Sequence, residues 1–136
     1  LKDDMNEIYE LFDEGDMFVI ASPLYFNNVS SYLKIVIDRC QKYFSLKYSL
    51  NKVYKKHKKR IGVFISVGGA PYSNGHFDGS IKTMDLFFKA IDVKYLGNYF
   101  ISGTDVKPVW NRNDVLKEIY NIGKNIDKTS NFYLHR

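Results

Sequence analysis

Three short and almost continuously apolar segments divide this sequence, and stretches with helical spacing lie between them. They are residues 17–21 (MFVIA), 61–67 (IGVFISV) and 95–101 (YLGNYFI). Runs of this length and composition are typical of strands that helices cover on both faces, as in parallel sheets. The alternation predicts an α/β layered fold with a parallel sheet. We also expect residues 17–21 to have a neighbouring strand on each side.

The helical stretches are recognised by apolar residues that recur every three or four positions. The last of them is expected to begin at a cap formed by Asn113 or Asp114. With 136 residues, the chain has the length of one domain. We therefore expect a single three-layer α/β/α sandwich over residues 1–136, with helices over residues 4–12, 29–44 and 80–91 and from residue 113 onward.

Composition narrows the possible cofactors and locations. The single cysteine, Cys40, excludes an internal disulfide and a cysteine-rich metal site, and its place in a helical stretch predicts a buried structural thiol. The three histidines, His57, His76 and His135, are dispersed, so we expect no metal site. No apolar run approaches the roughly 18 residues that span a membrane, so we expect a cytoplasmic protein with no membrane partner. The net charge of +5 favours anionic ligands.

The loop after the first strand is the first candidate binding site, because ligands of parallel α/β sheets lie beyond the carboxyl ends of the strands. It leads into a helix, whose first backbone N–H groups are free to bind a ligand oxygen. In the alternative interpretation, Asn28 or Ser30 is only a helix N-cap and the aromatic residues close the core. The candidate binding residues here are Ser22, Pro23, Leu24, Tyr25, Phe26, Asn27 and Asn28.

The loop after the second strand, residues 68–79, is long and rich in glycine. Gly68 and Gly69 allow the backbone to approach a ligand closely, and Tyr72 follows them. No Gly-Lys-Ser/Thr sequence follows, so this is not a P-loop. For residues 73–75 a flexible surface loop is the favoured interpretation. A third loop, residues 102–111, either covers a site or meets another subunit.

The first loop and the helix after it carry a string that is specific enough to suggest a family. It reads SPLYFNNVS over residues 22–30, continues with Leu33-Lys34 and closes with Asp38-Arg39. Together with Val67-Gly68-Gly69, this string resembles the NADPH-dependent FMN reductase and iron–sulfur flavoprotein family, whose fold is flavodoxin-like. The resemblance implies a sheet of order 2-1-3-4-5, to which this chain contributes strands 3–5 and their helices. The first βαβ portion of the fold is then absent.

The same resemblance implies an FMN-binding oxidoreductase. Such an enzyme takes electrons from NAD(P)H, passes them to a small-molecule acceptor and forms a homodimer. Residues 23–28 would hold the ribityl chain and the edge of the ring, largely through backbone groups. Gly68 and Gly69 would approach the ring, and Tyr72 or His76 would reach it. Because the flavin itself carries the chemistry, no catalytic side chain is expected.

Three helical residues of the string, Lys34, Asp38 and Arg39, are interpreted as structural or as part of a dimer contact. Two family features are missing from the sequence. The phosphate-binding loop, a Gly-Ser-Pro-Arg-like stretch, is not found, and a single cysteine cannot supply the paired ligands of an iron–sulfur cluster. The loss of this loop would remove the main anchor for the FMN phosphate.

A basic run offers a competing interpretation. Nucleic-acid binding would start from this run, since it places several cations close together. A solvated connector between a helix and a strand is the favoured interpretation, so we expect no nucleic-acid partner. A third possibility is a non-catalytic flavodoxin-like binding module. The run, over residues 52–60, contains Lys52, Lys55, Lys56, Lys58, Lys59 and Arg60.

Overall fold

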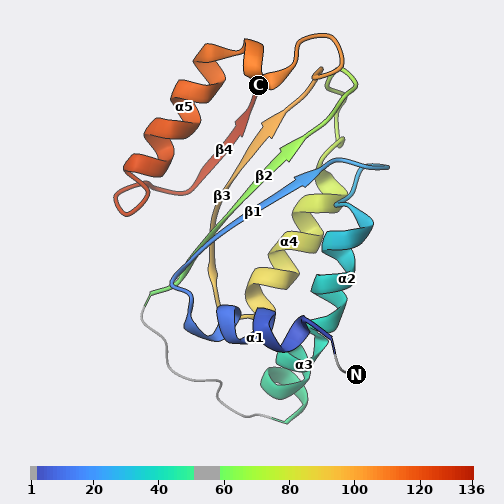
Figure 1. The fold of residues 1–136 in the computed structure, drawn as a ribbon, viewed down its shortest axis with the longest axis vertical. Coiled ribbons are helices and arrows are strands. Elements are labelled where there is room, and N and C mark those ends of the chain that lie inside the picture. The colour runs from blue at the N-terminus through green and yellow to red at the C-terminus, as the bar shows by residue number, and fades with distance from the viewer. Residues whose placement is uncertain (1–2, 51–58) are drawn as a thin grey trace.

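A computed structural model describes residues 3–50 and 59–136, and four parallel strands form its centre (Figure 1). The sheet order is β1-β2-β3-β4, and every neighbouring pair is parallel. This confirms the predicted α/β fold with a parallel sheet. The strands are β1 (Met17–Pro23), β2 (Ile61–Val67), β3 (Lys94–Ile101) and β4 (Phe132–His135).

Helices cover the two faces of the sheet unequally. One face is packed by helices whose apolar side chains join a single core cluster with β1, β2 and β3. The opposite face is packed by α5 (Asn113–Lys124) alone, within the described part of the chain (Figure 1). The helices of the first face are α1 (Met5–Glu14), α2 (Ser31–Arg39), α3 (Gln41–Phe44) and α4 (Asp78–Ala90).

The core between the sheet and α4 is built from large, fully buried side chains. Phe64 and Phe100 project from the neighbouring strands β2 and β3, with ring centroids 5.8 Å apart and an edge-to-face arrangement. Met84 and Phe88 of α4 are equally inaccessible to solvent. A Cβ atom at Gly62 would overlap the ring of Phe88, so a glycine is required there for α4 to approach the sheet.

The α5 face has a smaller core and is uncovered at β1. Tyr99, Ile101 and Val115 are its buried residues. On β1, however, Met17 is 49% exposed and Val19 is 58% exposed. Within the described residues β1 pairs with β2 alone. The expectation that residues 17–21 have a strand on each side is therefore not met by this part of the chain.

The helix predicted over residues 29–44 is divided. Ser30 caps α2 by accepting a hydrogen bond from the Leu33 N–H at 3.4 Å, which confirms it as the N-cap. At Cys40 the N–H donates to the carbonyls of both Val36 and Ile37, so the helix tightens and ends before α3 begins. The last helix begins at Asn113, but no side chain caps it; the expected cap by Asn113 or Asp114 is wrong.

The fourth strand is an element that the sequence analysis missed. It has only four residues, partly exposed, and polar residues flank it. It pairs with β3 from Gly97↔Phe132 to Phe100↔His135. Because α5 lies on the face opposite to α4 while β4 extends the sheet in the same direction, the β3–α5–β4 connection has the opposite hand to the preceding one. Right-handed connections are the rule, so the usual topology does not lead one to expect a strand at this position.

Candidate functional site

Three loops meet at the carboxyl end of the sheet, as expected for a parallel α/β fold. They are the first loop (residues 24–30) after β1, the second loop (residues 68–77) after β2 and the third loop (residues 102–108) after β3. The Leu24 N–H donates to the Val67 carbonyl at 2.8 Å, and the Gly68 N–H donates to the Ile101 carbonyl at 2.8 Å. These two bonds place the starts of the three loops side by side.

The first loop is a tight turn that presents an aromatic side chain to solvent. Tyr25 and Asn28 exchange two backbone hydrogen bonds, at 2.9 and 3.0 Å. Between them, Phe26 and Asn27 have positive φ angles of 49° and 61°. Asparagine tolerates this left-handed region, but for a bulky residue it is strained and points to a functional constraint. The Phe26 side chain is fully exposed and Tyr25 is largely exposed, so neither closes the core.

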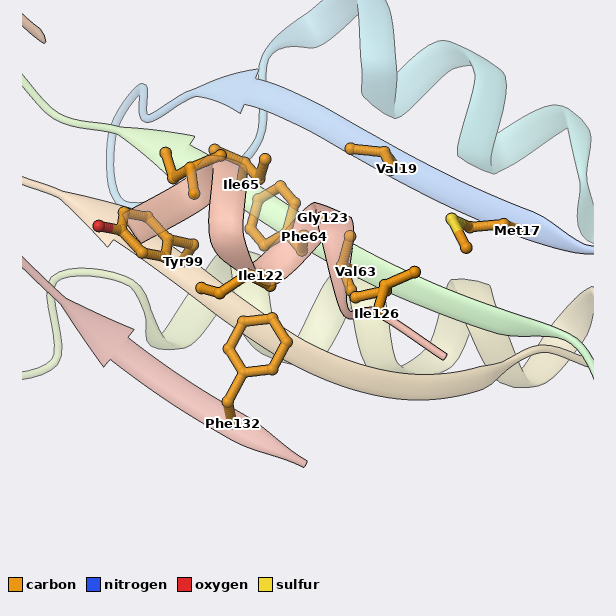
Figure 2. A pocket seen from close by; sticks show the side chains of 11 residues that line it. Met17, Val19, Val63, Phe64, Ile65, Tyr99, Ile122, Gly123, Ile126 and Phe132 are labelled. Atoms are coloured by element: carbon orange, nitrogen blue, oxygen red, sulfur yellow. The ribbon is translucent and has the colours of Figure 1, made fainter. Parts of the chain in front are cut away.

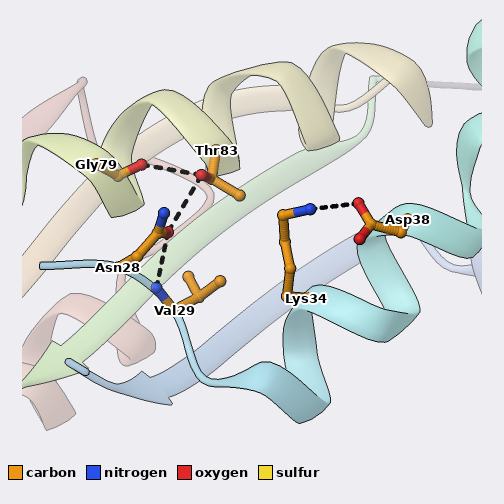
Figure 3. A network of polar contacts seen from close by, with 6 residues as sticks. All are labelled: Asn28, Val29, Lys34, Asp38, Gly79 and Thr83. Carbon is orange, nitrogen blue, oxygen red and sulfur yellow. Dashed lines mark hydrogen bonds and ion pairs between the residues drawn. The ribbon is translucent and has the colours of Figure 1, made fainter. Parts of the chain in front are cut away.

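The turn is held in place by the start of α4. Asn28 Oδ1 accepts from the Val29 N–H at 2.8 Å and from the Thr83 hydroxyl at 3.2 Å (Figure 3). The same hydroxyl lies 2.9 Å from the Gly79 carbonyl, to which it can also donate. A Cβ atom at Gly79 would lie 2.5 Å from the Asn27 carbonyl oxygen. The Asn28 side chain is therefore engaged within the protein, while the backbone of the turn is left on the surface.

Ser22, at the base of this loop, also has a local role. Its buried hydroxyl accepts from the Ser30 N–H at 2.9 Å and donates to the Pro23 carbonyl at 2.9 Å. These bonds tie the end of β1 to the N-cap of α2. Pro23 and Leu24 are partly buried beneath the turn.

The third loop supports the second through backbone hydrogen bonds. A Cβ atom at Gly69 would overlap Oδ2 of the exposed Asp105 side chain, which would have to move aside to admit it. The structure thus gives the third loop a function that the sequence left open, since it fixes the two glycines of the candidate site. In these backbone hydrogen bonds, the Gly103 N–H donates to the Ala70 carbonyl at 2.8 Å, the Thr104 N–H to the Gly68 carbonyl at 3.1 Å and the Asp105 N–H to the Gly69 carbonyl at 3.2 Å.

Several N–H groups of the first two loops are left to bind a ligand. Those of Phe26, Asn27, Gly69 and Ala70 donate to no acceptor among residues 3–50 and 59–136. Such donors suit a flat ligand with carbonyl groups along one edge, and the isoalloxazine of FMN has such an edge. The residues present therefore fit the ring of FMN. They include no Gly-Ser-Pro-Arg-like loop for its phosphate.

Tyr72 lies apart from the other predicted binding residues. Its ring packs against His135 of β4, with centroids 4.0 Å apart, and β4 is the edge strand of the sheet on the side opposite to β1. His76 packs against Phe77, with centroids 5.4 Å apart, and its Nδ1 atom is buried without a partner in the described chain. The structure brings together residues 22–28 with Gly68 and Gly69, and places Tyr72 beside β4.

The sequence analysis did not find the partners of Tyr72. Ser102 Oγ, directly after β3, lies 2.8 Å from Nε2 of His135. Burial lowers the pKa of His135, and the neighbouring His76 and Arg136 lower it further. The only signal for this pair is the alternation of residues 132–135, which is too short to identify a strand.

The helical residues of the family string make ion pairs on the surface. Lys34 pairs with Asp38 one turn later on α2 (Figure 3), and Arg39 Nη1 lies 2.5 Å from Asp3 Oδ2. These contacts support the structural interpretation. Cys40 is buried as predicted, and burial raises the pKa of its thiol to about 12.

The basic run lies mostly outside the described residues, which include only Lys59 and Arg60 of it. Arg60 is 3% exposed, and its guanidinium donates hydrogen bonds to the backbone carbonyls of three separate segments. It therefore is not available to a nucleic acid. The acceptors are the carbonyls of Gly15 at 2.9 Å, Ile91 at 2.8 Å and Phe12.

An apolar cavity of about 170 Å³ lies away from the three loops, between α5 and the middle of the sheet (Figure 2). Val19, Ile65 and Ile122 are among its lining side chains. Because the lining is almost entirely apolar, it offers no group for catalysis. Among the described helices, none has the length and apolar character needed to cross a bilayer.

Comparison with known proteins identifies the relatives of this chain. The sequence profile of the NADPH-dependent FMN reductase family matches residues 1–106. An iron–sulfur flavoprotein of Methanocaldococcus jannaschii is 37% identical over 87 residues, which are 64% of this chain and 40% of that protein. An iron–sulfur flavoprotein of Archaeoglobus fulgidus is 43% identical over 82 residues, or 60% of this chain and 35% of that protein. The chain thus matches well under half the length of these relatives.

Solved structures show the same fold at lower identity. A flavone reductase superimposes with a TM-score of 0.61 and 13% identity, covering 99% of this chain and 51% of its own. An FMN-dependent NADH-azoreductase from Bacillus anthracis, in complex with FMN, gives a TM-score of 0.62 and 20% identity, with 90% and 61% coverage. At these identities the likeness supports the flavodoxin-like fold.

Proposed function

Because this chain belongs to the NADPH-dependent FMN reductase family, we propose that it binds FMN and takes part in electron transfer from NAD(P)H to a small-molecule acceptor. One observation carries the proposal. The first two loops lie side by side at the carboxyl end of the sheet and expose backbone N–H groups that have no partner within the described residues. The names of the relatives, which are iron–sulfur flavoproteins, and of an FMN-bound structural neighbour agree with it.

The proposed site holds the ring of FMN mainly through the backbone. The N–H groups of Phe26, Asn27, Gly69 and Ala70 would donate to its carbonyl-bearing edge. The exposed side chains of the turn would lie against its flat surface, where aromatic contacts are favourable. The full set of proposed cofactor-binding residues is Ser22, Pro23, Leu24, Tyr25, Phe26, Asn27, Asn28, Gly68, Gly69 and Tyr72.

In this proposal FMN carries out the redox chemistry and the protein binds and orients it, as is general for flavin cofactors. FMN, when bound, accepts a hydride from the nicotinamide and releases electrons to the acceptor. The chain's own groups would bind and orient it, and the backbone donors would stabilise negative charge at the edge of the ring. No acidic or basic side chain is required to move a proton in this scheme.

We further propose that the described chain forms only part of a flavodoxin-like domain. The exposed apolar face of β1 at Met17 and Val19 supports this, since it suits an internal strand. The same face continues into the apolar cavity beneath α5 (Figure 2). Residues outside this sequence would then supply a strand beside β1, a helix over the cavity and the anchor for the FMN phosphate.

A homodimer and a cytoplasmic location are also part of the proposal. Tyr25, Phe26, Tyr32 and Ile35 are exposed apolar residues on the first loop and α2, and a second copy would bury such residues. The single buried thiol suits a reducing compartment, where disulfides are rare.

The test is a titration with FMN, followed by flavin absorbance and fluorescence, of this chain and of a longer chain extended by the upstream part of a relative. Tyr25→Ala is expected to weaken FMN binding about fivefold, because an aromatic contact is worth about 1 kcal/mol. Tyr120→Ala, which removes an equally exposed tyrosine from α5, serves as the control and should change nothing. Absence of FMN binding in both wild-type chains, or equal affinity of the Tyr25→Ala variant, would contradict the proposed site.

A further inference from the structure

A cluster of side chains at the carboxyl end of β3 and β4 joins the second loop to the last strand. Tyr72 and Phe77 of the second loop both contact the ring of His135, with centroid separations of 4.0 and 5.8 Å. Ser102, which begins the third loop, lies 2.8 Å from the same imidazole. The His135 side chain of β4 therefore contacts both the second and the third loop.

We propose that His135 is a positioning residue for the flavin-binding backbone at Gly68 and Gly69, acting through Tyr72 and Ser102. The inference rests on the proposed function, because it concerns the same site. It assigns to β4 a task beyond extending the sheet. The strand holds the two loops whose mutual hydrogen bonds set the direction of the free N–H groups at Gly69 and Ala70.

The route through Ser102 is short and made largely of backbone. The Ser102 N–H donates to the Arg136 carbonyl at 2.8 Å, and the Arg136 N–H donates to the Phe100 carbonyl at 2.8 Å. The next residue, Gly103, has a φ of 68° and donates to Ala70. A shift of Ser102 is thus transmitted directly to the hydrogen bonds that fix Gly68 and Gly69.

The route through Tyr72 depends on the ring of His135. Tyr72 is half exposed, and the packing of its ring on the imidazole is the aromatic contact that holds this part of the second loop to β4. An aromatic pair contributes about 0.5–1.5 kcal/mol beyond the area that it buries. Loss of this contact would free residues 70–75, in which few backbone bonds are made.

The protonation of His135 should modulate this arrangement. The titratable or charged groups around it are Tyr72 and His76 of the second loop, Tyr133 of β4, and Arg136 directly after β4. Asp78, at the start of α4, acts on Tyr133. Arg136 is already paired with Glu118. Burial, with His76 and Arg136 nearby, lowers the pKa of His135, so its neutral form is the one that the cluster favours. Acidification would charge the imidazole and loosen both loops.

The experiment compares two variants that each keep half of the interactions of His135. His135→Phe keeps a ring against Tyr72 and loses the bond to Ser102, whereas His135→Gln keeps a polar group for Ser102 and loses the ring. Leu134→Ala is the matched control, because Leu134 lies on the same strand and packs on the α5 face. The measurements are the dissociation constant for FMN and the hydrogen exchange of amides 68–77 without FMN.

We expect each His135 variant to raise the dissociation constant for FMN about three- to tenfold and to speed amide exchange in residues 68–77, with little effect of Leu134→Ala. In the wild type, the protection factors of this loop, which are the intrinsic exchange rates divided by the observed ones, should fall as the pH is lowered from 8 to 5. In His135→Phe this fall should be absent. Ser102→Ala, which removes the hydroxyl beside His135, should reproduce the effects of His135→Phe on FMN affinity and on exchange at a fixed pH.

The outcomes separate this inference from the proposed function. Unchanged exchange and unchanged FMN affinity in both His135 variants would overturn the positioning role. A wild type that ignores FMN would remove the proposed function, while the exchange data would still decide whether His135 holds the loops. If the His135 variants do not fold by circular dichroism, Ser102→Ala decides alone, and normal exchange in that variant would overturn the inference.

Discussion

The two faces of the sheet use the same strands but are completed to very different degrees. On the α4 face, Phe64, Met84, Phe88 and Phe100 are fully inaccessible to solvent. On the α5 face, Val19 of β1 is mostly exposed, and an apolar cavity remains beside it (Figure 2). The comparison teaches that the apolar sequence of a strand indicates that its faces are suited to burial. It does not indicate which segment of a protein covers those faces.

The largest expected effect is the loss of a side chain from the completed face. Phe88→Ala should lower the free energy of unfolding by about 3–5 kcal/mol, since it leaves a cavity that a well-packed core cannot close. Urea denaturation followed by circular dichroism measures this value. A loss below about 1 kcal/mol would mean that the α4 face is packed no better than the α5 face.

A pair of glycine substitutions gives effects of opposite sign on the two faces. Gly62→Ala should destabilise by about 1–3 kcal/mol, because its Cβ atom would overlap the ring of Phe88. Gly123→Ala in α5 meets no atom within 4 Å and should stabilise by about 0.5 kcal/mol through helix propensity. Both values come from urea midpoints, and destabilisation by Gly123→Ala would show that the α5 face is packed too tightly to accept a methyl group at this position.

The exposed part of the α5 face should tolerate a polar residue. Val19→Thr keeps the β-branched shape and should change the free energy of unfolding by less than about 0.5 kcal/mol, since exposed sites rarely contribute more. The same substitution in a chain extended by the upstream part of a relative should cost more. Equal and small losses in both chains would argue against a segment that covers β1.

The smallest expected effect is a dependence of stability on pH at His135, beside the completed face. Its lowered pKa means that the folded protein binds fewer protons at this site than the unfolded chain does. The stabilisation is therefore fully present above the ordinary histidine value of 6.5 and is lost as the pH falls below it. Urea midpoints at pH 7.5 and 5.5 should differ less in His135→Phe than in the wild type; equal differences would exclude the effect.

Much of the architecture was predictable because it depends on local patterns. The apolar runs at residues 61–67 and 95–101 identified β2 and β3 to within one residue. The helical spacing from residue 29 placed the start of α2 to within two residues, and the string around Tyr25 marked the loop that the structure puts at the carboxyl end of the sheet. Periodicity, caps and turn residues act over a few positions, so a sequence displays them directly.

The rest depends on contacts between distant residues. Sequence alone could not show that Phe26 adopts a left-handed conformation, because the turn is held by Thr83 and Gly79 of α4. Nor could it show that Arg60, within a basic run, is buried among backbone carbonyls.

The last strand is the clearest case of a feature decided by tertiary structure. The four residues of β4 are half exposed, and their apolar pattern is too short to predict a strand. The strand β4 forms because β3 has an open edge with which it can pair and because α5 covers one face of it. Its position brings His135 to Ser102 and Tyr72, residues 33 and 63 positions earlier in the chain. The sequence by itself determined β1 to β3, the helices and the site-forming loops, since these are local. The packing of the sheet decided which side chains meet, because that depends on long-range geometry.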